Sequence, residues 1–233
     1  MNKFYNIAVD GPSGAGKSTL SRRCAGAFGF IYVDTGAIYR SIALAAYRKG
    51  IDRENEEELV SMLLEIEVKM AYDRNGEQKM YLNGEDVSKA IRLPEISACA
   101  SQVSAHAGVR EYLLEMQRKL ARENNVIMDG RDIGTVVLPE ADLKIFLTAS
   151  AEARAKRRLL ELEQKGIETD FETVLSDIIK RDKKDSERAA APLKAAEDSV
   201  LVDTSELDFE QSFRKLCEII SERLNIEKIE DRK

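Results

Sequence analysis

The sequence predicts a three-layer α/β fold, with helices on both faces of a five-stranded parallel core sheet. Three observations predict it: short apolar strands alternate with helices, a glycine-rich loop follows the first strand, and one segment of period-two alternation interrupts the series. The chain's 233 residues suffice for one domain with insertions. The strands are expected at residues 7–9, 30–33, 125–128, 143–147 and 199–202.

The loop after the first strand has the spacing of a Walker A phosphate-binding loop, which is typical of P-loop NTPases. Its glycines let backbone N–H groups turn inward around phosphate oxygens, and the helix that starts near Lys17 adds a partial positive charge. Lys17 is expected to reach the β- and γ-phosphates of a nucleotide, and the Ser18 hydroxyl to hold Mg²⁺. The alternative is a glycine-rich turn that binds nothing. The residues expected to hold the phosphates are Gly11, Pro12, Ser13, Gly14, Ala15, Gly16, Lys17, Ser18 and Thr19.

The second strand leads into a helix over residues 36–49, with Asp34 and Thr35 at its start. Ligands bind at the carboxyl ends of parallel strands, so Thr35 and Arg40 are expected beside the nucleotide. A solvated helix charge is the alternative for Arg40. An acidic helix over 54–64 follows, and then residues 66–70 and 79–82 alternate around the turn at 73–76, which predicts an antiparallel insertion near residues 60–90. One long helix is expected over 103–123.

The third strand ends in Asp129, where a P-loop protein places the carboxylate that organises Mg²⁺. A carboxylate that only caps the following loop is the alternative. After the fourth strand, a helix over 150–164 carries four cations within five positions, which we expect to face a polyphosphate, although a solvated face also explains such a run. Helices over 171–185 and 209–224 complete the chain. The four cations are Arg154, Lys156, Arg157 and Arg158.

Composition narrows the class of protein further. A net charge of −6 argues against a nucleic-acid binder, and no run approaches the roughly 18 apolar residues of a membrane span. The first residues enter a strand without the apolar region of a secretory signal, so a cytoplasmic location is expected. Cys24, Cys99 and Cys217 are interpreted as reduced core thiols and the lone His106 as structural.

Missing motifs exclude two classes of P-loop protein. The Asn-Lys-x-Asp motif with which GTPases read guanine is absent, and so is the Leu-Ser-Gly-Gly signature of transporter ATPases. A compact small-molecule kinase remains, with an insertion after the second strand and a basic helix after the fourth.

Six segments in order resemble the bacterial cytidylate kinase family. They are DGPSGAGKST (10–19), DTGAIYR (34–40), ASQVSA (100–105), VRE (109–111), DGRDIGTVVLPEADLKIFL (129–147) and RDKKDSERAAAPL (181–193). The resemblance implies transfer of the γ-phosphate of ATP to CMP or dCMP, with Mg²⁺, by a single kinase domain over residues 1–233. Its NMP-binding region would span about 36–105 and its lid about 150–186. A monomer that acts on small molecules is expected.

The resemblance also implies a role for each matching residue. The CMP phosphate would be held by Arg40, Arg131 and Arg188. The cytosine would be read by Ser101, Arg110 and Asp132. The sugar would be held by Arg181 and Asp185, with Thr35 alongside. The catalytic set would be Lys17, Asp129, Arg131 and, for the transferring phosphate, Arg157. Two alternatives stay open: a kinase of the same architecture that acts on UMP or another phosphate acceptor, and a nucleotide-binding regulatory or RNA-associated protein.

Overall fold

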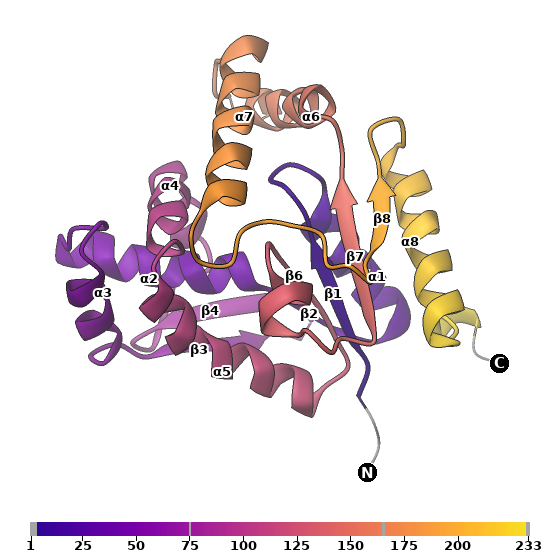
Figure 1. The fold of residues 1–233 in the computed structure, drawn as a ribbon, viewed down its shortest axis with the longest axis horizontal. Helices are drawn as coiled ribbons and strands as arrows, with labels where there is room; N and C mark the ends of the chain where they lie inside the picture. The colour runs from indigo at the N-terminus through magenta and orange to yellow at the C-terminus, as the bar shows by residue number, and fades with distance from the viewer. Residues whose placement is uncertain (1–3, 75, 165, 232–233) are drawn as a thin grey trace.

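A computed structural model describes residues 4–74, 76–164 and 166–231 (Figure 1). Its main sheet has the strand order β2-β6-β1-β7-β8, and all neighbouring strands pair in parallel. The predicted five-stranded parallel core sheet is therefore confirmed. The strands are β1 (Asn6–Asp10), β2 (Ile31–Asp34), β6 (Val126–Gly130), β7 (Leu143–Thr148) and β8 (Val200–Asp203).

Both faces of this sheet are covered because successive strand residues point to opposite sides. Ile7 and Val9 of β1 pack with α1 (Lys17–Phe28) and α8 (Phe209–Leu224), in a core that also buries Phe28. Ala8 points the other way, into a core shared with α5 (Ala107–Glu123) and the π-helical segment η2 (Ile133–Val137). Sheet and helices thus form three layers.

The phosphate loop lies at the switch point of the sheet. β1 pairs with β6 on one side and β7 on the other, so chain connections leave it in opposite directions, which opens a crevice at the carboxyl ends of the strands. In Figure 1, α6 (Ala151–Gln164) and α7 (Phe171–Glu187) stand above these strand ends. They share a small apolar core of their own, which contains Ala155, Val174 and Ile178.

The predicted antiparallel insertion is confirmed, with a third strand that the alternation did not indicate. Its sheet has the order β3-β4-β5 and lies beside the parallel sheet (Figure 1). An extensive apolar core around Ile38, Leu59, Met80 and Ile96 holds the insertion together. Asn75 of the expected turn lies outside the described residues. The elements are α2 (Thr35–Lys49), α3 (Glu56–Leu63), β3 (Val68–Tyr72), β4 (Gln78–Leu82), β5 (Glu85–Asp86), η1 (Ala90–Arg92) and α4 (Pro94–Val103).

The expectation of one helix over 103–123 is wrong. α4 ends at Val103 and α5 begins at Ala107, with extended backbone at His106 (φ −80°, ψ 130°) between them. The two helices pack against different partners, α4 against α2 and α5 against α3, so the chain must turn there. The His106 ring supports the turn, with its Nε2 atom 2.7 Å from the Arg53 carbonyl oxygen.

Other expectations about single residues hold. Cys24, Cys99 and Cys217 are buried and free, as core thiols should be.

The short helix η3 (Ile229–Asp231) follows α8. In the part of the chain that the structure describes, no helix is both long and apolar enough to cross a bilayer.

Candidate active site

The loop between β1 and α1 is shaped by glycine. Gly11, Gly14 and Gly16 have φ values of 148°, 78° and 87°, a region that other residues rarely adopt. A Cβ atom on Gly11 would lie 1.9 Å from the Leu147 carbonyl oxygen, so no side chain fits there. The helix begins at Lys17, and its first N–H groups therefore face the loop. This is the geometry of an anion-binding nest.

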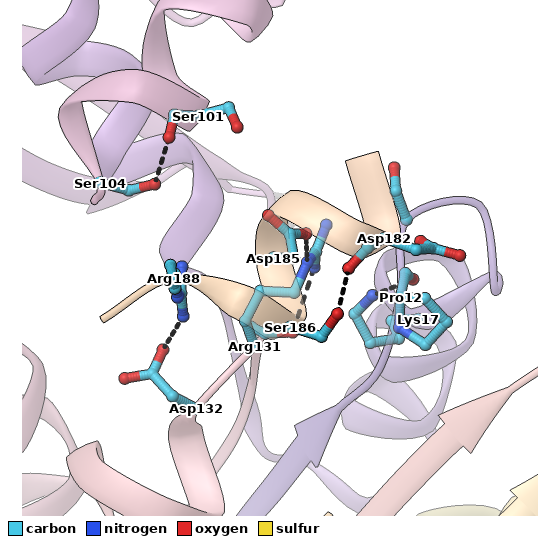
Figure 2. Close-up of polar contacts among 12 residues, drawn as sticks. Pro12, Lys17, Ser101, Ser104, Arg131, Asp132, Asp182, Asp185, Ser186 and Arg188 are labelled. Carbon is cyan, nitrogen blue, oxygen red and sulfur yellow. Dashed lines mark hydrogen bonds and ion pairs between the residues drawn. The ribbon is translucent and has the colours of Figure 1, made fainter. Parts of the chain in front are cut away.

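Lys17 is a buried cation at this nest, with 5% of its surface exposed. Its Nζ atom donates to the Pro12 carbonyl oxygen at 2.7 Å (Figure 2). Burial lowers the pKa of Lys17 well below its usual value, and the nearby charge of Arg131 lowers it further. An anion bound in the nest would offset both effects.

Ser18 and Asp129, predicted from separate motifs, meet in space. The Ser18 hydroxyl donates to Asp129 Oδ2 at 2.7 Å, and the Tyr32 hydroxyl donates to Oδ1 at 3.2 Å. Burial, and then the charge of Asp34, raise the pKa of Asp129 to about 6. No group of three His, Cys, Asp or Glu side chains among the described residues could hold a metal. One carboxylate and one hydroxyl nevertheless suit Mg²⁺, which usually takes few protein ligands and completes its shell with waters and substrate phosphates.

A second set of charges centres on Asp132, directly after β6. Its carboxylate pairs with Arg110 of α5 and, at 3.4 Å, with Arg188, which follows α7. Arg110 also lies over the Tyr39 ring, 5.5 Å from its centre. Asp132 is only 4% exposed, so both ion pairs are largely shielded from water. The two arginines and the carboxylate thus form one polar cluster.

Arg131 connects this cluster to the phosphate loop. Its Nε atom donates to Asp185 Oδ2 at 2.9 Å, and Figure 2 shows this pair between the Asp132–Arg188 pair and Lys17. The Arg181 side chain forms no hydrogen bond or ion pair within the described residues. Although this side chain is exposed on α7, loss of water around its guanidinium group, and then the charge of Arg131, lower the pKa of Arg181. The guanidinium groups of Arg131 and Arg181 and the Asp185 carboxylate are thus close enough to interact, and such a combination suits the binding of an anion.

Arg40, Ser101 and Thr35 lie at the margins of this set. Arg40 Nη2 donates to Asp34 Oδ2 at 2.8 Å, whereas its buried Nε atom has no hydrogen-bond partner in the described structure. Such a donor is costly unless a ligand accepts from it. Thr35 is buried and donates to the Asp129 carbonyl oxygen at 2.7 Å. Ser101 lies near the end of α4, across from Arg188 (Figure 2).

The cations of α6 do not converge, which corrects the expectation of a common face. Arg154 is buried, donates to the Ser13 carbonyl oxygen at 3.1 Å and forms a bidentate pair with Asp182 of α7. Arg157 donates to the Thr204 carbonyl oxygen at 2.5 Å, beyond β8. Arg158 pairs with Glu161 on the surface, and Lys156 is exposed. The assignment of Arg157 to the transferring phosphate stays a prediction.

A comparison with family models identifies the family of the chain. The model described as "Cytidylate kinase" matches residues 7–222. The chain belongs to the cytidylate kinase family. It is 45% identical over 226 residues to a cytidylate kinase of Syntrophotalea carbinolica, covering 97% of this chain and 96% of the relative. It is 48% identical over 219 residues to one of Caldicellulosiruptor bescii, covering 93% and 96%.

A solved structure shows the same fold at low identity. An uncharacterized protein from Eubacterium ventriosum superposes with a TM-score of 0.52 at 11% identity, covering 93% of this chain and 98% of that one. This likeness concerns the fold alone. The family assignment therefore depends on the sequence comparisons, and the range that the family model matches, residues 7–222, includes both the phosphate loop and the Asp132 cluster.

Sequence reasoning missed two residues that shape the site, Asp10 and Asp182, and the contacts that Arg154 makes. Arg154 and Asp182 fasten the phosphate loop to α7, and no motif marks that pair because its members come from two helices. Asp10 was noted only as part of the motif, yet its buried carboxylate accepts hydrogen bonds from the backbone beyond Asp132. A signal existed: an acidic residue ends an apolar strand, the pattern that singled out Asp129.

Proposed function

We propose that this cytidylate kinase family member transfers the γ-phosphoryl group of ATP to CMP or dCMP, giving ADP and CDP or dCDP. One observation carries the proposal. A buried lysine in a glycine nest and a separate cluster of arginines with carboxylates lie on either side of the Arg131–Asp185 pair. Two anion sites that share a border suit a reaction between two phosphorylated substrates.

On the donor side, residues 11–19 would hold the ATP phosphates, with Lys17 at the β- and γ-phosphates. Ser18 and Asp129 would hold Mg²⁺, directly or through its waters. When bound there, the ion would neutralise charge that develops on the phosphate oxygens. The hydrogen bond of 2.7 Å between Ser18 and Asp129 supports a shared role in holding the ion.

On the acceptor side, each proposed role matches the chemistry of the side chain. Guanidinium groups suit phosphate because their fork of donors meets two oxygens. The Asp132 carboxylate would accept from the exocyclic amine of cytosine, which uracil lacks. The Asp185 carboxylate would accept from a sugar hydroxyl. The phosphate would be held by Arg40, Arg131 and Arg188, the base by Ser101, Arg110 and Asp132, and the sugar by Arg181 and Asp185, with Thr35 alongside.

The reaction needs no general base. The attacking group is a CMP phosphate oxygen, which is ionised at neutral pH, so the protein has to hold two anions in line and neutralise the charge between them. Lys17 and Arg131 would neutralise that charge, and Arg157 would join them if the proposed lid, which consists of α6 and α7, closes on ATP. Closure would also exclude water, which otherwise accepts the phosphoryl group.

We also propose a cytoplasmic monomer that acts on small molecules and not on nucleic acid. The net charge of −6 supports the last point, because phosphate backbones attract basic proteins. Light scattering on the purified protein measures the oligomeric state, and a dimer mass would contradict the proposal.

The test is ADP formation from Mg-ATP with CMP, dCMP, UMP, AMP or GMP supplied one at a time. Rapid turnover with CMP and dCMP, and little with AMP or GMP, is expected. Faster turnover with UMP would instead indicate a uridylate-directed kinase of the same architecture. Tight ATP binding without acceptor-dependent ADP would indicate a regulatory nucleotide-binding protein.

A further inference from the structure

Asp10 is a buried carboxylate with no part in the chemistry proposed above. It ends β1, directly before Gly11 of the phosphate loop, and only 5% of its surface is exposed. Its two oxygens accept from consecutive backbone N–H groups, Oδ1 from Ile133 at 2.8 Å and Oδ2 from Gly134 at 2.7 Å. Both donors belong to the π-helical segment η2.

The segment η2 starts directly after the residue proposed to read the base. Asp132 directly precedes Ile133, and the first N–H groups of a helical segment lack partners within it. Asp10 supplies those partners. The other end of η2 is held from α5, where Arg118 donates to the carbonyl oxygens of Val136 and Val137, each at 3.0 Å.

The backbone register shows why the bonds between Asp10 and η2 would fix the distance between the two proposed substrate sites. Asp10 lies opposite Gly130 in the β1–β6 pairing, so β6 alone positions the chain as far as Gly130. Beyond that point Arg131 and Asp132 leave the sheet, and the bonds from Ile133 and Gly134 to Asp10 are where this stretch returns to β1. A carboxylate suits this task because both of its oxygens accept, whereas an amide would offer one acceptor and one donor.

We propose that Asp10 is a positioning residue, which holds Asp132 and Arg131 at a set place relative to Lys17 by anchoring the start of η2 to the phosphate-loop strand. The proposal rests on the proposed function, since it assigns Asp132 to cytosine. Asp10 touches neither substrate in this account and acts through the backbone of residues 131–134.

The test is Asp10→Asn, compared with the matched variant Asp142→Asn. Asp142 also accepts from a backbone N–H of β1, that of Asn6 at 2.9 Å, but at the opposite end of the strand. Asp10→Asn should raise the KM for CMP about tenfold, the scale of one lost hydrogen bond to a charged group. The KM for ATP should change by less than about twofold, and the preference for CMP over UMP should fall. Asp142→Asn should alter none of the three.

A uniform rise in both KM values, or a fall in kcat alone, would mean that Asp10 acts through the phosphate loop and would overturn the proposal. If Asp10→Asn does not fold, Arg118→Met decides, because it releases the other end of η2: a selective rise in the KM for CMP supports the proposal, and an unchanged value refutes it. Absence of CMP phosphorylation by the wild type would refute the proposed function instead, so the two failures are distinguishable.

Discussion

The cations proposed above for the donor side and for the acceptor side of the site differ in what they bond to. On the donor side, Lys17 and Arg157 donate to backbone carbonyl oxygens, which are neutral. On the acceptor side, the arginines pair with carboxylates: Arg40 with Asp34, Arg131 with Asp185, and Arg110 and Arg188 with Asp132. Lys17 and Arg157 therefore form no ion pair within the described residues, whereas four of the five acceptor-side arginines are held by three carboxylates.

This difference matches the proposed ligands. A triphosphate brings several negative charges, which Lys17 and Arg157 can accept without giving up an ion pair. A monophosphate brings fewer charges. The arginines proposed to bind it would either leave their carboxylate for a phosphate oxygen or donate to both. Carboxylates that hold guanidinium groups in place also offer acceptors to a base and a sugar, so the acceptor side can select its ligand by more than charge.

The largest effect is expected for Lys17→Ala. Removing this cation should lower kcat at least about a hundredfold, the scale of one lost charge-stabilising group. The fold should persist, because the bond that disappears is to a neutral carbonyl oxygen and burial disfavours the charge. Steady-state rates and circular dichroism measure the two outcomes. Lys156→Ala, at an exposed position of α6, is the control, and near-normal turnover of Lys17→Ala would remove Lys17 from the mechanism.

The next effect is expected on the acceptor side, for Asp132→Asn. Loss of the carboxylate removes the partner of Arg110 and Arg188 and replaces an acceptor by an amide that can also donate to uracil. We expect kcat/KM for CMP to fall roughly 5- to 100-fold and the preference for CMP over UMP to fall with it. Initial rates with both acceptors test this, with Asp198→Asn, an exposed partner of Lys144, as the control. An unchanged preference would assign base selection elsewhere.

The sequence predicted the core sheet and the phosphate loop because both depend on local patterns. The residues of a buried strand such as 125–128 follow one another in the sequence, and Gly11 and Lys17 belong to one short motif. The break at His106 was not predictable in this way, because the apolar face that predicted the helix, from Val109 to Leu120, does not show where the helix begins. A contact with Arg53, far away in the chain, makes the turn.

The same limit applies to the site. Helical spacing on α6 predicted that its cations face one polyphosphate, but the bonding partners of Arg154 and Arg157 lie on other elements. Ser13 of the phosphate loop and Asp182 of α7 bind Arg154, while Thr204 binds Arg157. Spacing within one helix cannot show such partners. Motifs shared with a family predicted the acceptor residues, and only the folded structure shows the ion pairs among them.

Arg154 breaks the pattern of the donor side, because its partner there is the Asp182 carboxylate. Arg154→Met should lower the free energy of unfolding by about 2 to 3 kcal/mol, since Asp182 and two carbonyl oxygens lose their donor in a largely buried place. Urea unfolding measures the change. Arg158→Met, which removes an exposed pair with Glu161, should have no measurable effect, and equal losses in the two variants would contradict the distinction.

The smallest expected effect is a change of the free energy of unfolding with pH, which arises from the buried Asp10 carboxylate. Burial raises the pKa of Asp10 from 3.8 to about 6, against the opposing effect of its hydrogen bonds from Gly134 and Ile133. In the unfolded chain this group ionises near pH 4, so between about pH 4 and 6 the folded protein keeps a proton that the unfolded chain has lost. Ionised Asp10 therefore lowers the free energy of unfolding, an effect that is absent below about pH 4 and complete above about pH 6.

Relative to Asp10→Asn, the wild type should thus lose about 2 kcal/mol of stability between about pH 4.5 and pH 7. Urea unfolding of both proteins at several pH values measures this difference, and the comparison cancels the titration of groups that the two share. A wild type that gains stability relative to the variant as the pH rises would show that the bonds to η2 outweigh the burial of the charge. The predicted loss would instead mean that the fold tolerates a destabilising charge at the junction of its two substrate sites, as expected of a residue retained for positioning.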